Sequence, residues 1–303
     1  MRVPKESHIC VCICTYKRPE PLNRLLSKLD TQETEGLFDF SIVIVDNDRL
    51  ESARQTVESR ARASKILIRY YVEPEQNIAL ARNRAIENSE GDFVAFIDDD
   101  EFPEEQWLVT LYKTIHHYGS DGILSPVLAH FDETPPQWVL RGHFFDRPTH
   151  PTGHVLEWKN TRTGNALLKR DLFNEGTKWF DPSFGSGGED RDFFRRKIEE
   201  GHIFIWCNEA PVFETVPPKR WERTVLLKRA LLRGKMALNT REPKFMSLFK
   251  AAMAVAAYSC CLPVLFFLGH HVFMKYLIKD CDHLGKLLAS LGIDWVGEKY
   301  VGG

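Results

Sequence analysis

Four consecutive carboxylates, Asp98-Asp99-Asp100-Glu101, follow directly on the apolar run at residues 93–97. Adjacent carboxylates repel one another, so folding alone does not favour such a cluster. A hard divalent cation bound by carboxylate oxygens would remove the repulsion. A solvated acidic turn is the commoner explanation of an acidic run. The abrupt change from apolar to acidic, however, is typical of a buried strand that ends at a ligand site, and we predict a metal site here.

A second acidic pair, Glu189-Asp190, follows a glycine-rich stretch at residues 185–188. The pair lies in the first turn of a helix predicted at 189–200, where the helix dipole favours carboxylates whether or not they have a function. Gly187 and Gly188 would allow a ligand to approach the backbone closely, which favours a binding site. A carboxylate at such a site could remove a proton from a hydroxyl group as a general base.

Alternating strands and helices must position these residues. Apolar runs predict strands at residues 8–14, 40–46, 66–72 and 93–97, and helices are predicted after Pro19, at 51–63 and at 77–88. This alternation predicts an α/β fold with a mainly parallel sheet. Because parallel strands end at one edge of their sheet, Thr15, Asp46 and Asp98 should converge there.

The pattern changes beyond residue 103. We predict a helix at 104–118, a strand at 121–131, irregular structure at 134–151 and a short strand at 164–170. No glycine fingerprint of the G-x-G-x-x-G or P-loop type follows the first strand. A bound nucleotide would therefore need another counter-charge for its phosphates, and a cation on the aspartates would supply it.

The composition is that of a globular protein, with 43% hydrophobic and 27% charged residues among 303. A formal net charge of −2 argues against a nucleic-acid-binding protein. Seven cysteines and an N-terminus without an apolar signal core predict reduced thiols in a cytoplasmic setting. Cys10, Cys12 and Cys14 would share one strand face. A metal site is conceivable there, but the equally apolar opposite face favours core packing.

Beyond residue 218 the chain is first basic and then apolar. The basic residues are Lys219, Arg220, Arg223, Lys228, Arg229, Arg233, Lys235, Arg241, Lys244 and Lys250, and residues 251–269 carry no charge. The apolar stretch is at the lower limit for a spanning helix, and Ser259 and Pro263 within it suggest a kink or a re-entrant hairpin. A buried hairpin in a soluble protein is the alternative. We expect membrane association, because basic residues beside an apolar segment suit anionic lipid.

Several short motifs occur together in this chain. They are Cys14-Thr15-Tyr16 with Arg18-Pro19, Val45-Asp46-Asn47, residues 77–83 ending in Arg82-Asn83, Ile97-Asp98-Asp99-Asp100-Glu101, Thr163-Gly164-Asn165, Gly187-Gly188-Glu189-Asp190 and Glu214-Thr215-Val216-Pro217. With these motifs, over roughly residues 8–235, the sequence resembles the family 2 glycosyltransferases of the GT-A fold. Within that family it is similar to bacterial glucosyltransferases of the succinoglycan type, which extend lipid-linked saccharides. The motifs together are specific for the family but not for the sugar.

The resemblance implies an α/β, Rossmann-like, mainly parallel mixed sheet flanked by helices. The basic and apolar composition beyond residue 218 adds a helical membrane-associating extension to this expectation. The resemblance implies a catalytic domain at 1–217, with a nucleotide-sugar-binding half at 1–102 and an acceptor-binding half at 103–217, and a C-terminal region at 218–303. The implied nucleotide-sugar residues are Thr15, Tyr16, Arg18, Asp46, Asn47, Arg82, Asp98 and Asp99. Asp100 and Asp98 would hold Mn²⁺ or Mg²⁺, and Asp190, with Glu189 beside it, would be the general base.

The acceptor residues are expected from the sequence context. Gly188 lies beside the expected base, and Trp158 could stack on a sugar ring, although core packing is the default for a tryptophan. Arg220 and Arg223 lie in the basic run, where cations could bind a lipid diphosphate. We expect the protein at the cytoplasmic face of the inner or plasma membrane, as a peripheral or monotopic protein.

The expected reaction is an inverting, metal-assisted transfer from a nucleotide-diphosphate sugar, with a UDP-hexose expected, to a hydroxyl of a lipid-linked saccharide. Two alternatives remain. A metal-dependent nucleotidyltransferase or phosphohydrolase would use the aspartates without needing the pair at 189–190, and a silent sugar-nucleotide-binding protein would need no acidic residues at either place. No Gln-x-x-Arg-Trp motif is present, so we expect one sugar to be transferred per encounter.

Overall fold

The computed structural model describes residues 7–174, 176, 179–184, 187–237 and 244–293. Gly185 and Ser186 of the glycine-rich stretch and Arg241 of the basic run lie outside these residues. The chain forms two compact units, one of Met1–Leu128 with Arg147–Glu214 and one of Ala129–Asp146 with Thr215–Gly302. The second unit thus includes Ala129–Asp146, whereas we divided the chain at residue 217; that division stays a prediction.

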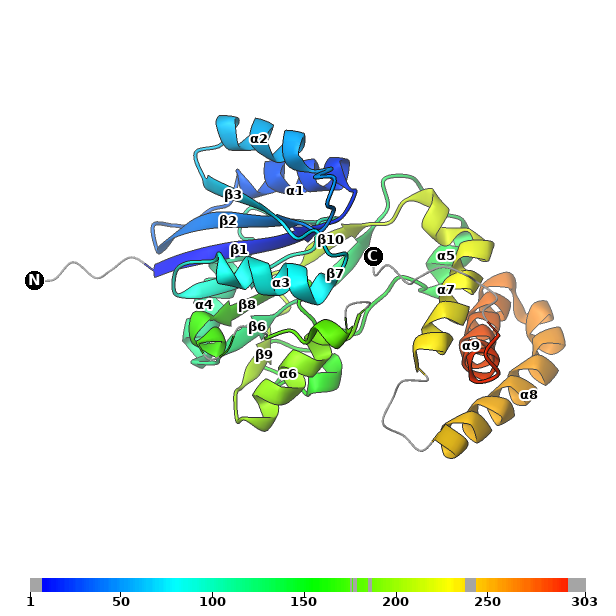
Figure 1. Ribbon diagram of the computed structural model, residues 1–303. Coiled ribbons are helices and arrows are strands. Elements are labelled where there is room, and N and C mark those ends of the chain that lie inside the picture. Colours follow the sequence, from blue (N-terminus) through cyan, green and yellow to red (C-terminus); the bar gives the residue numbers. More distant parts are fainter. Residues whose placement is uncertain (1–6, 175, 177–178, 185–186, 238–243, 294–303) are drawn as a thin grey trace, which may run out of the picture. The chain divides into compact units, whose positions relative to one another are not determined.

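The first unit is built on a seven-stranded sheet (Figure 1). Its strands are β1 (Ser7–Thr15), β2 (Phe38–Asp46), β3 (Leu67–Val72), β4 (Phe93–Phe96), β6 (Gly122–Leu124), β8 (Ala166–Lys169) and β9 (Phe204–Trp206). The strand order is β3-β2-β1-β4-β8-β6-β9, and β1 to β4 are parallel where they pair. β8 is antiparallel to both of its neighbours. The predicted mixed, mainly parallel α/β sheet is confirmed.

Helices cover both faces of this sheet. They are α1 (Pro19–Leu29), α2 (Arg54–Ala63), α3 (Ile78–Glu87), α4 (Trp107–Tyr118) and α6 (Glu189–Glu199), with short 3-10 turns at Trp158–Asn160, Arg170–Phe173 and Pro182–Phe184. β1 is buried on both faces, as its apolar run predicts. Ile9, Val11 and Ile13 face α1, α2 and α4, and Cys10 and Cys12 pack in the core with α3 and α6. The core interpretation of these two cysteines is therefore confirmed.

Two local predictions are wrong. The strand expected at 121–131 is two strands in two sheets, β6 and β7 (Val127–His130), and the second sheet has the order β5 (Glu101–Pro103), β10 (Val212–Thr215), β7. Pro126 separates β6 from β7, since proline has no N–H to continue a ladder; its carbonyl instead accepts from the Val212 amide. The stretch 134–151, expected to be irregular, contains helix α5 (Gln137–Gly142) directly after two prolines.

The second unit is mainly helical. It contains α5, a 3-10 turn at Pro218–Trp221, α7 (Arg223–Met236), α8 (Lys244–Leu268) and α9 (His270–Ser290). α8 is helical through Pro263, and the chain reverses only at Gly269, whose φ of 129° suits glycine. A Cβ at Gly285 would lie 2.2 Å from the Leu231 carbonyl oxygen. Glycine there lets α7 and α9 approach backbone to backbone.

Candidate active site

The carboxyl-terminal ends of β1, β2 and β4 lie at one edge of the sheet, as predicted. Thr15 ends β1, Asp46 ends β2, and the acidic run begins two residues after β4. The Thr15 hydroxyl donates to Oδ2 of Asp99 at 2.7 Å. Arg18 donates from Nη1 to Oδ1 of Asp99 at 3.2 Å and to Oδ2 of Asp100 at 3.0 Å. The loop after β1 therefore binds the acidic run directly.

The three aspartates have different environments. The Asp99 side chain is 7% exposed, and burial raises its pKa to about 7 although Arg18 opposes the shift. The side chain of Asp100 is 14% exposed and that of Asp98 is 49% exposed. Asp98 and, to a lesser degree, Asp100 are thus more accessible to a ligand than Asp99, which is turned into the protein.

Glu101, for which the sequence suggested no role, is buried beneath the acidic run. Its carboxylate accepts from the Asp98 amide at 3.1 Å, and burial raises its pKa well above the usual value. A Cβ at Gly164 would lie 2.9 Å from an Asp98 oxygen and 3.1 Å from a Glu101 oxygen. Glu101 and Gly164 therefore fix the conformation of the turn that presents Asp98.

Asp46 and Asn47 are satisfied by the chain itself. Asp46 is fully buried and accepts from the amides of Asp48 and Ala53 and from the Tyr70 hydroxyl at 2.8–3.0 Å. The Asn47 side chain donates to the carbonyl of Glu73 at 3.0 Å and to that of Glu75. It also accepts from the Asn77 amide, at the start of α3, at 2.9 Å. In this structure the two residues shape the loops at the sheet edge.

Arg82 links the two acidic sites that the sequence indicated. It lies on α3, is largely buried, and forms an ion pair with Glu189 at the start of α6. Its other nitrogen, Nη2, lies 3.7 Å from Oδ1 of Asp98. Glu189 is also buried, and its Oε2 has no hydrogen-bond partner among the described residues. Carboxylates about ninety residues apart in sequence therefore belong to one site.

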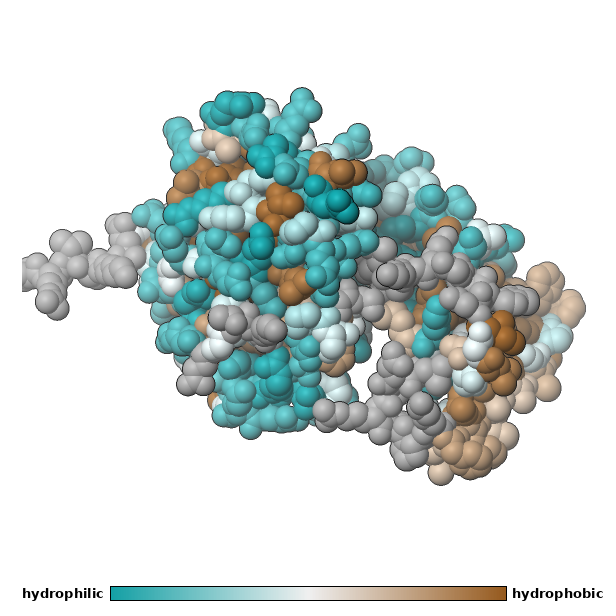
Figure 2. All heavy atoms as spheres, viewed as in Figure 1, coloured by the Kyte–Doolittle hydropathy of each residue, from teal (hydrophilic) through white to brown (hydrophobic). Residues whose placement is uncertain are grey.

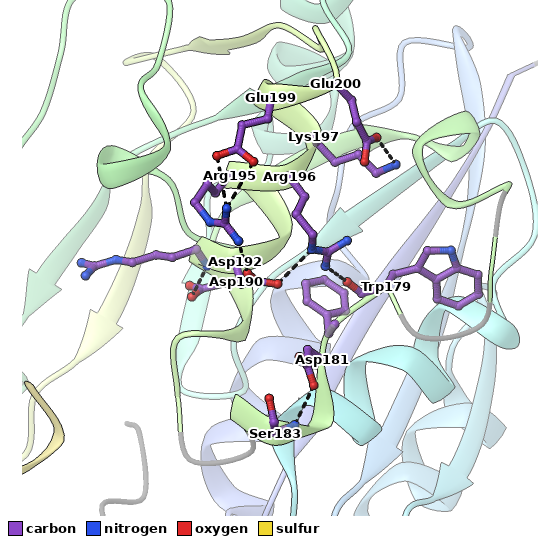
Figure 3. A network of polar contacts seen from close by, with 12 residues as sticks. Trp179, Asp181, Ser183, Asp190, Asp192, Arg195, Arg196, Lys197, Glu199 and Glu200 are labelled. Carbon is purple, nitrogen blue, oxygen red and sulfur yellow. Dashed lines mark hydrogen bonds and ion pairs between the residues drawn. The ribbon is translucent and has the colours of Figure 1, made fainter. Parts of the chain in front are cut away.

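Helix α6 presents Asp190 from its first turn (Figure 3). Gly187 and Gly188 have φ values of 124° and 101°, in the left-handed region that favours glycine. Within the part of the chain that the structure describes, the Asp190 side chain accepts only from the neighbouring amide of Arg191, at 2.7 Å. Asp192, two residues on, is instead held by ion pairs to Arg195 and Arg196, at 2.7 and 2.9 Å. Of the two aspartates, Asp190 is the one left available to a substrate.

Two arginines that the sequence did not single out belong to the same region. Arg147 pairs with Glu214, a member of one of the motifs. Arg162 is part-buried and makes no hydrogen bond or ion pair with the described residues, and burial together with Arg147 lowers its pKa to about 10. The carboxylates of Glu101, Asp190 and Asp98 oppose this shift. Arg162 precedes the Thr163-Gly164-Asn165 motif, which was the only sequence signal for it.

The remaining candidates are less well placed. The Lys17 ammonium lies over the Tyr16 ring, 5.0 Å from the ring centre. Trp158 lies in a 3-10 turn and is 36% exposed. The Lys159 ammonium lies 5.6 Å from the centre of the Trp158 ring. Arg220 and Arg223 belong to the second unit, where Arg223 lies 5.9 Å from the Trp138 ring centre.

The donor set can be tested against a divalent cation. Within the described ranges, no three His, Cys, Asp or Glu side chains are arranged to hold a metal by themselves. Mg²⁺ in proteins is commonly bound by one or two carboxylates, with substrate phosphates and water completing its six ligands. Asp98 and Asp100 meet that requirement, since both are hard oxygen donors and Asp98 is half exposed.

The sequence of the chain is similar to those of known proteins. The family model for glycosyl transferase family 2 matches residues 10–179. The chain is 38% identical over 237 residues to the succinoglycan biosynthesis protein ExoM of Rhizobium meliloti, covering 77% of this chain and 75% of that one. It is 26% identical over 240 residues to a glucosyl-dolichyl phosphate glucuronosyltransferase of Haloferax volcanii, covering 75% and 69%.

Solved structures share the fold. The mannosyltransferase PcManGT of Pyrobaculum calidifontis, in complex with GDP-Man and Mn²⁺, has a TM-score of 0.62 at 16% identity, over 97% of this chain and 89% of that one. Residues 1–349 of S. aureus TarS in complex with UDP give 0.53 at 17% identity, over 95% and 93%. A longer TarS structure is spanned over only 55% of its length.

Proposed function

The chain is a glycosyltransferase and belongs to glycosyl transferase family 2, and from this premise we propose that it transfers one sugar from a nucleotide-diphosphate sugar to a hydroxyl group of a lipid-linked saccharide, with inversion. A UDP-hexose is the expected donor. The name of the ExoM relative supports a role in polysaccharide biosynthesis. That of the Haloferax relative supports a lipid-linked acceptor.

One observation carries the proposal: Arg82 contacts carboxylates of both acidic sites at once, Asp98 on the sheet edge and Glu189 on α6. A transferase needs a cationic and metal-binding region for the leaving diphosphate and a separate base for the acceptor hydroxyl. The aspartate run and Asp190 would provide the two parts, and Arg82 links the run to Glu189, the residue before Asp190.

On the donor side we propose direct roles for Arg18 and Arg82, and for Asp98 and Asp100. Arg18 and Arg82 would bind phosphate oxygens, since a guanidinium makes bidentate hydrogen bonds to phosphate. Thr15 would position Asp99, with which it is hydrogen-bonded. Asp46 and Asn47, with Tyr16 nearby in sequence, would shape the pocket of the base and ribose through the loops that they hold.

Asp98 and Asp100 would hold a divalent cation, Mn²⁺ or Mg²⁺, and the Mn²⁺ in the PcManGT complex supports a metal of this kind. When bound, the metal would stabilise negative charge on the leaving diphosphate. Arg18 already bridges Asp99 and Asp100, so the chain supplies part of the counter-charge itself. Buried Glu101 would keep the Asp98 turn in place.

On the acceptor side we propose that Asp190 removes the proton of the attacking hydroxyl. The carboxylate oxygens of Asp190 lie at the amino end of α6, and Gly188 gives the acceptor room to approach them. Glu189 would hold the helix start through Arg82, as a positioning residue. Trp158 could stack on a sugar, and Arg220 and Arg223 could bind a lipid diphosphate.

The test is the identity of the nucleotide product. The full chain is incubated with Mn²⁺ or Mg²⁺ and a panel of nucleotide sugars, with and without a membrane-lipid extract. We expect release of nucleoside diphosphate that depends on the extract. Release of nucleoside monophosphate or pyrophosphate would support a nucleotidyltransferase or phosphohydrolase instead, and donor binding without any release would indicate a silent binding protein.

A further inference from the structure

Helix α8 has an apolar face that its own unit leaves uncovered. Phe245–Leu268 is long and apolar enough to cross a membrane. Yet only 6% of its most apolar 18-residue segment is buried within the protein. One side of the helix presents the exposed residues Phe245, Phe249, Met253, Cys260, Val264 and Phe267. Phe267 is 86% exposed. In Figure 2 hydrophobic side chains gather over the region of α8 and α9.

The opposite side of α8 packs on α9. Apolar residues that are less exposed recur there at alternating spacings of three and four residues, the pattern of a helix–helix seam: Leu248, Ala251, Val255, Tyr258, Leu262 and Leu265. Rings meet across the seam. Tyr258 lies 5.8 Å from Tyr276 and 5.9 Å from His283, and Phe266 lies 5.6 Å from Phe273. The two helices therefore form an antiparallel hairpin.

Charged side chains lie along this hairpin at the level of the middle of α8. The Ser259 hydroxyl donates to Asp280 at 3.2 Å, and Asp280 is buried with Oδ1 unpartnered among the described residues. Asp282 pairs with Arg233 of α7 at 3.0 Å. Lys275 and Lys279 of α9 are exposed. If α8 crossed a bilayer, α9 would cross beside it and Asp280 would lie near the bilayer centre, where charge opposes insertion.

We propose that α8 lies flat in the interface of an anionic lipid bilayer and does not span it. Its outer face enters the boundary of headgroups and acyl chains, to a depth of about 5–10 Å. α9 remains in the headgroup layer, where Lys275 and Lys279 meet anionic lipid. The inference rests on the membrane association included in the proposed function and specifies its mode. A second copy of the chain is the competing occupant of the apolar face.

Depth along the helix tests the orientation. In the full chain carrying Cys260→Ser, Cys261→Ser and Cys281→Ser, single cysteines replace Phe245, Met253 or Phe267, which all lie on the outer face. Each is labelled with a fluorophore and quenched by lipids brominated at different acyl positions, in phosphatidylglycerol–phosphatidylcholine vesicles. We expect the same shallow depth at all three positions. A spanning helix would place Met253 deepest and both ends shallow, which would overturn the proposal.

A charge substitution tests the surface. Phe249→Glu with Met253→Glu should lower partition into these vesicles at least about tenfold, since two apolar side chains would no longer be buried. Leu67→Glu, an equally exposed leucine of the first unit, should leave it unchanged. Unaltered partition of the double variant would contradict the proposal. The proposal would also be contradicted if the wild type formed a dimer that did not bind vesicles and if the double variant were monomeric.

The two proposals fail in distinguishable ways. With the membrane-lipid extract dispersed in detergent, so that the acceptor is presented without a bilayer, nucleoside diphosphate release should be the same for Phe249→Glu/Met253→Glu as for the wild type, because neither residue belongs to the catalytic unit. If the wild type released diphosphate but did not bind vesicles, only the proposal that α8 binds a lipid surface would be rejected. Absent diphosphate release with normal vesicle binding would reject the transferase and leave the lipid surface standing.

Discussion

Carboxylates that are neighbours in sequence differ sharply in this site. Asp99 and Glu101 are buried, and burial raises the pKa of both, whereas Asp98 and Asp100 are more exposed. The acidic run and its place at a strand end were predictable, because an apolar-to-acidic junction is a local pattern. Which of the four carboxylates are buried and which are accessible was not predictable. This pattern depends on Thr15, Arg18 and Gly164, all of which are more than sixty residues away in the sequence.

Metal dependence should reside in Asp98 and Asp100. Asp98→Ala and Asp100→Ala should each weaken UDP binding about tenfold or more in the presence of Mn²⁺, since one of the two carboxylate ligands would be lost. Chelation with EDTA should weaken the wild type to a similar degree and the variants little further. Calorimetric titration measures each affinity. Asp39→Ala removes an exposed carboxylate of β2 as a control, and a normal metal response in Asp100→Ala would refute its assignment.

Breaking the Arg82–Glu189 ion pair should destabilise the protein, whereas replacing both residues with apolar ones should destabilise it much less. Arg82→Met leaves the buried Glu189 carboxylate without its partner and should lower the free energy of unfolding by about 3 kcal/mol. Arg82→Met with Glu189→Met removes both charges and should regain much of that loss. Urea unfolding midpoints give the comparison. A double variant no more stable than Arg82→Met would show that the pair is not coupled as described.

At the scale of elements, long periodic segments were predictable and short ones were not. The buried parallel strands and the helices at α1, α3, α4 and α6 follow from apolar runs and helical spacing. α5 has only six residues, too few to show a helical period. The split between β6 and β7 falls at Pro126, and Asn165 holds the two strand ends from a distance, since its amide donates to the carbonyls of Pro126 and Ala210 at 2.8 and 2.9 Å. Such distant contacts leave no local pattern.

The close crossing of α7 and α9 gives a prediction at this scale. Alanine normally stabilises a helix relative to glycine. Gly285→Ala should instead destabilise the second unit by about 1–3 kcal/mol, because its Cβ would lie 2.2 Å from the Leu231 carbonyl oxygen and the helices would have to separate. Thermal unfolding is the measurement, with Lys279→Ala on the exposed side of α9 as control. A stabilised Gly285→Ala protein would contradict the crossing.

For the whole molecule, a catalytic unit with a mixed, mainly parallel sheet is joined to a helical unit with an exposed apolar face. Family membership follows from the comparisons, and the fold class and reaction class were accessible from the motifs. The donor sugar and the acceptor linkage were not, because no motif in the chain reports the shape of a sugar pocket. The basic and apolar C-terminal composition indicated a membrane, but only the α8–α9 hairpin favours one orientation.

The central claim is that one site holds the leaving diphosphate and the base on separate carboxylates. The most direct measurement compares UDP affinity with the rate of acceptor-dependent diphosphate release in Asp190→Asn. Asp192→Asn, which alters an ion-paired aspartate of the same helix turn, is the matched control. We predict unchanged UDP affinity with a rate lowered about 10²–10⁴-fold in Asp190→Asn, and near-normal values for both in Asp192→Asn. A normal rate in Asp190→Asn, or equal loss in both variants, would contradict the assignment.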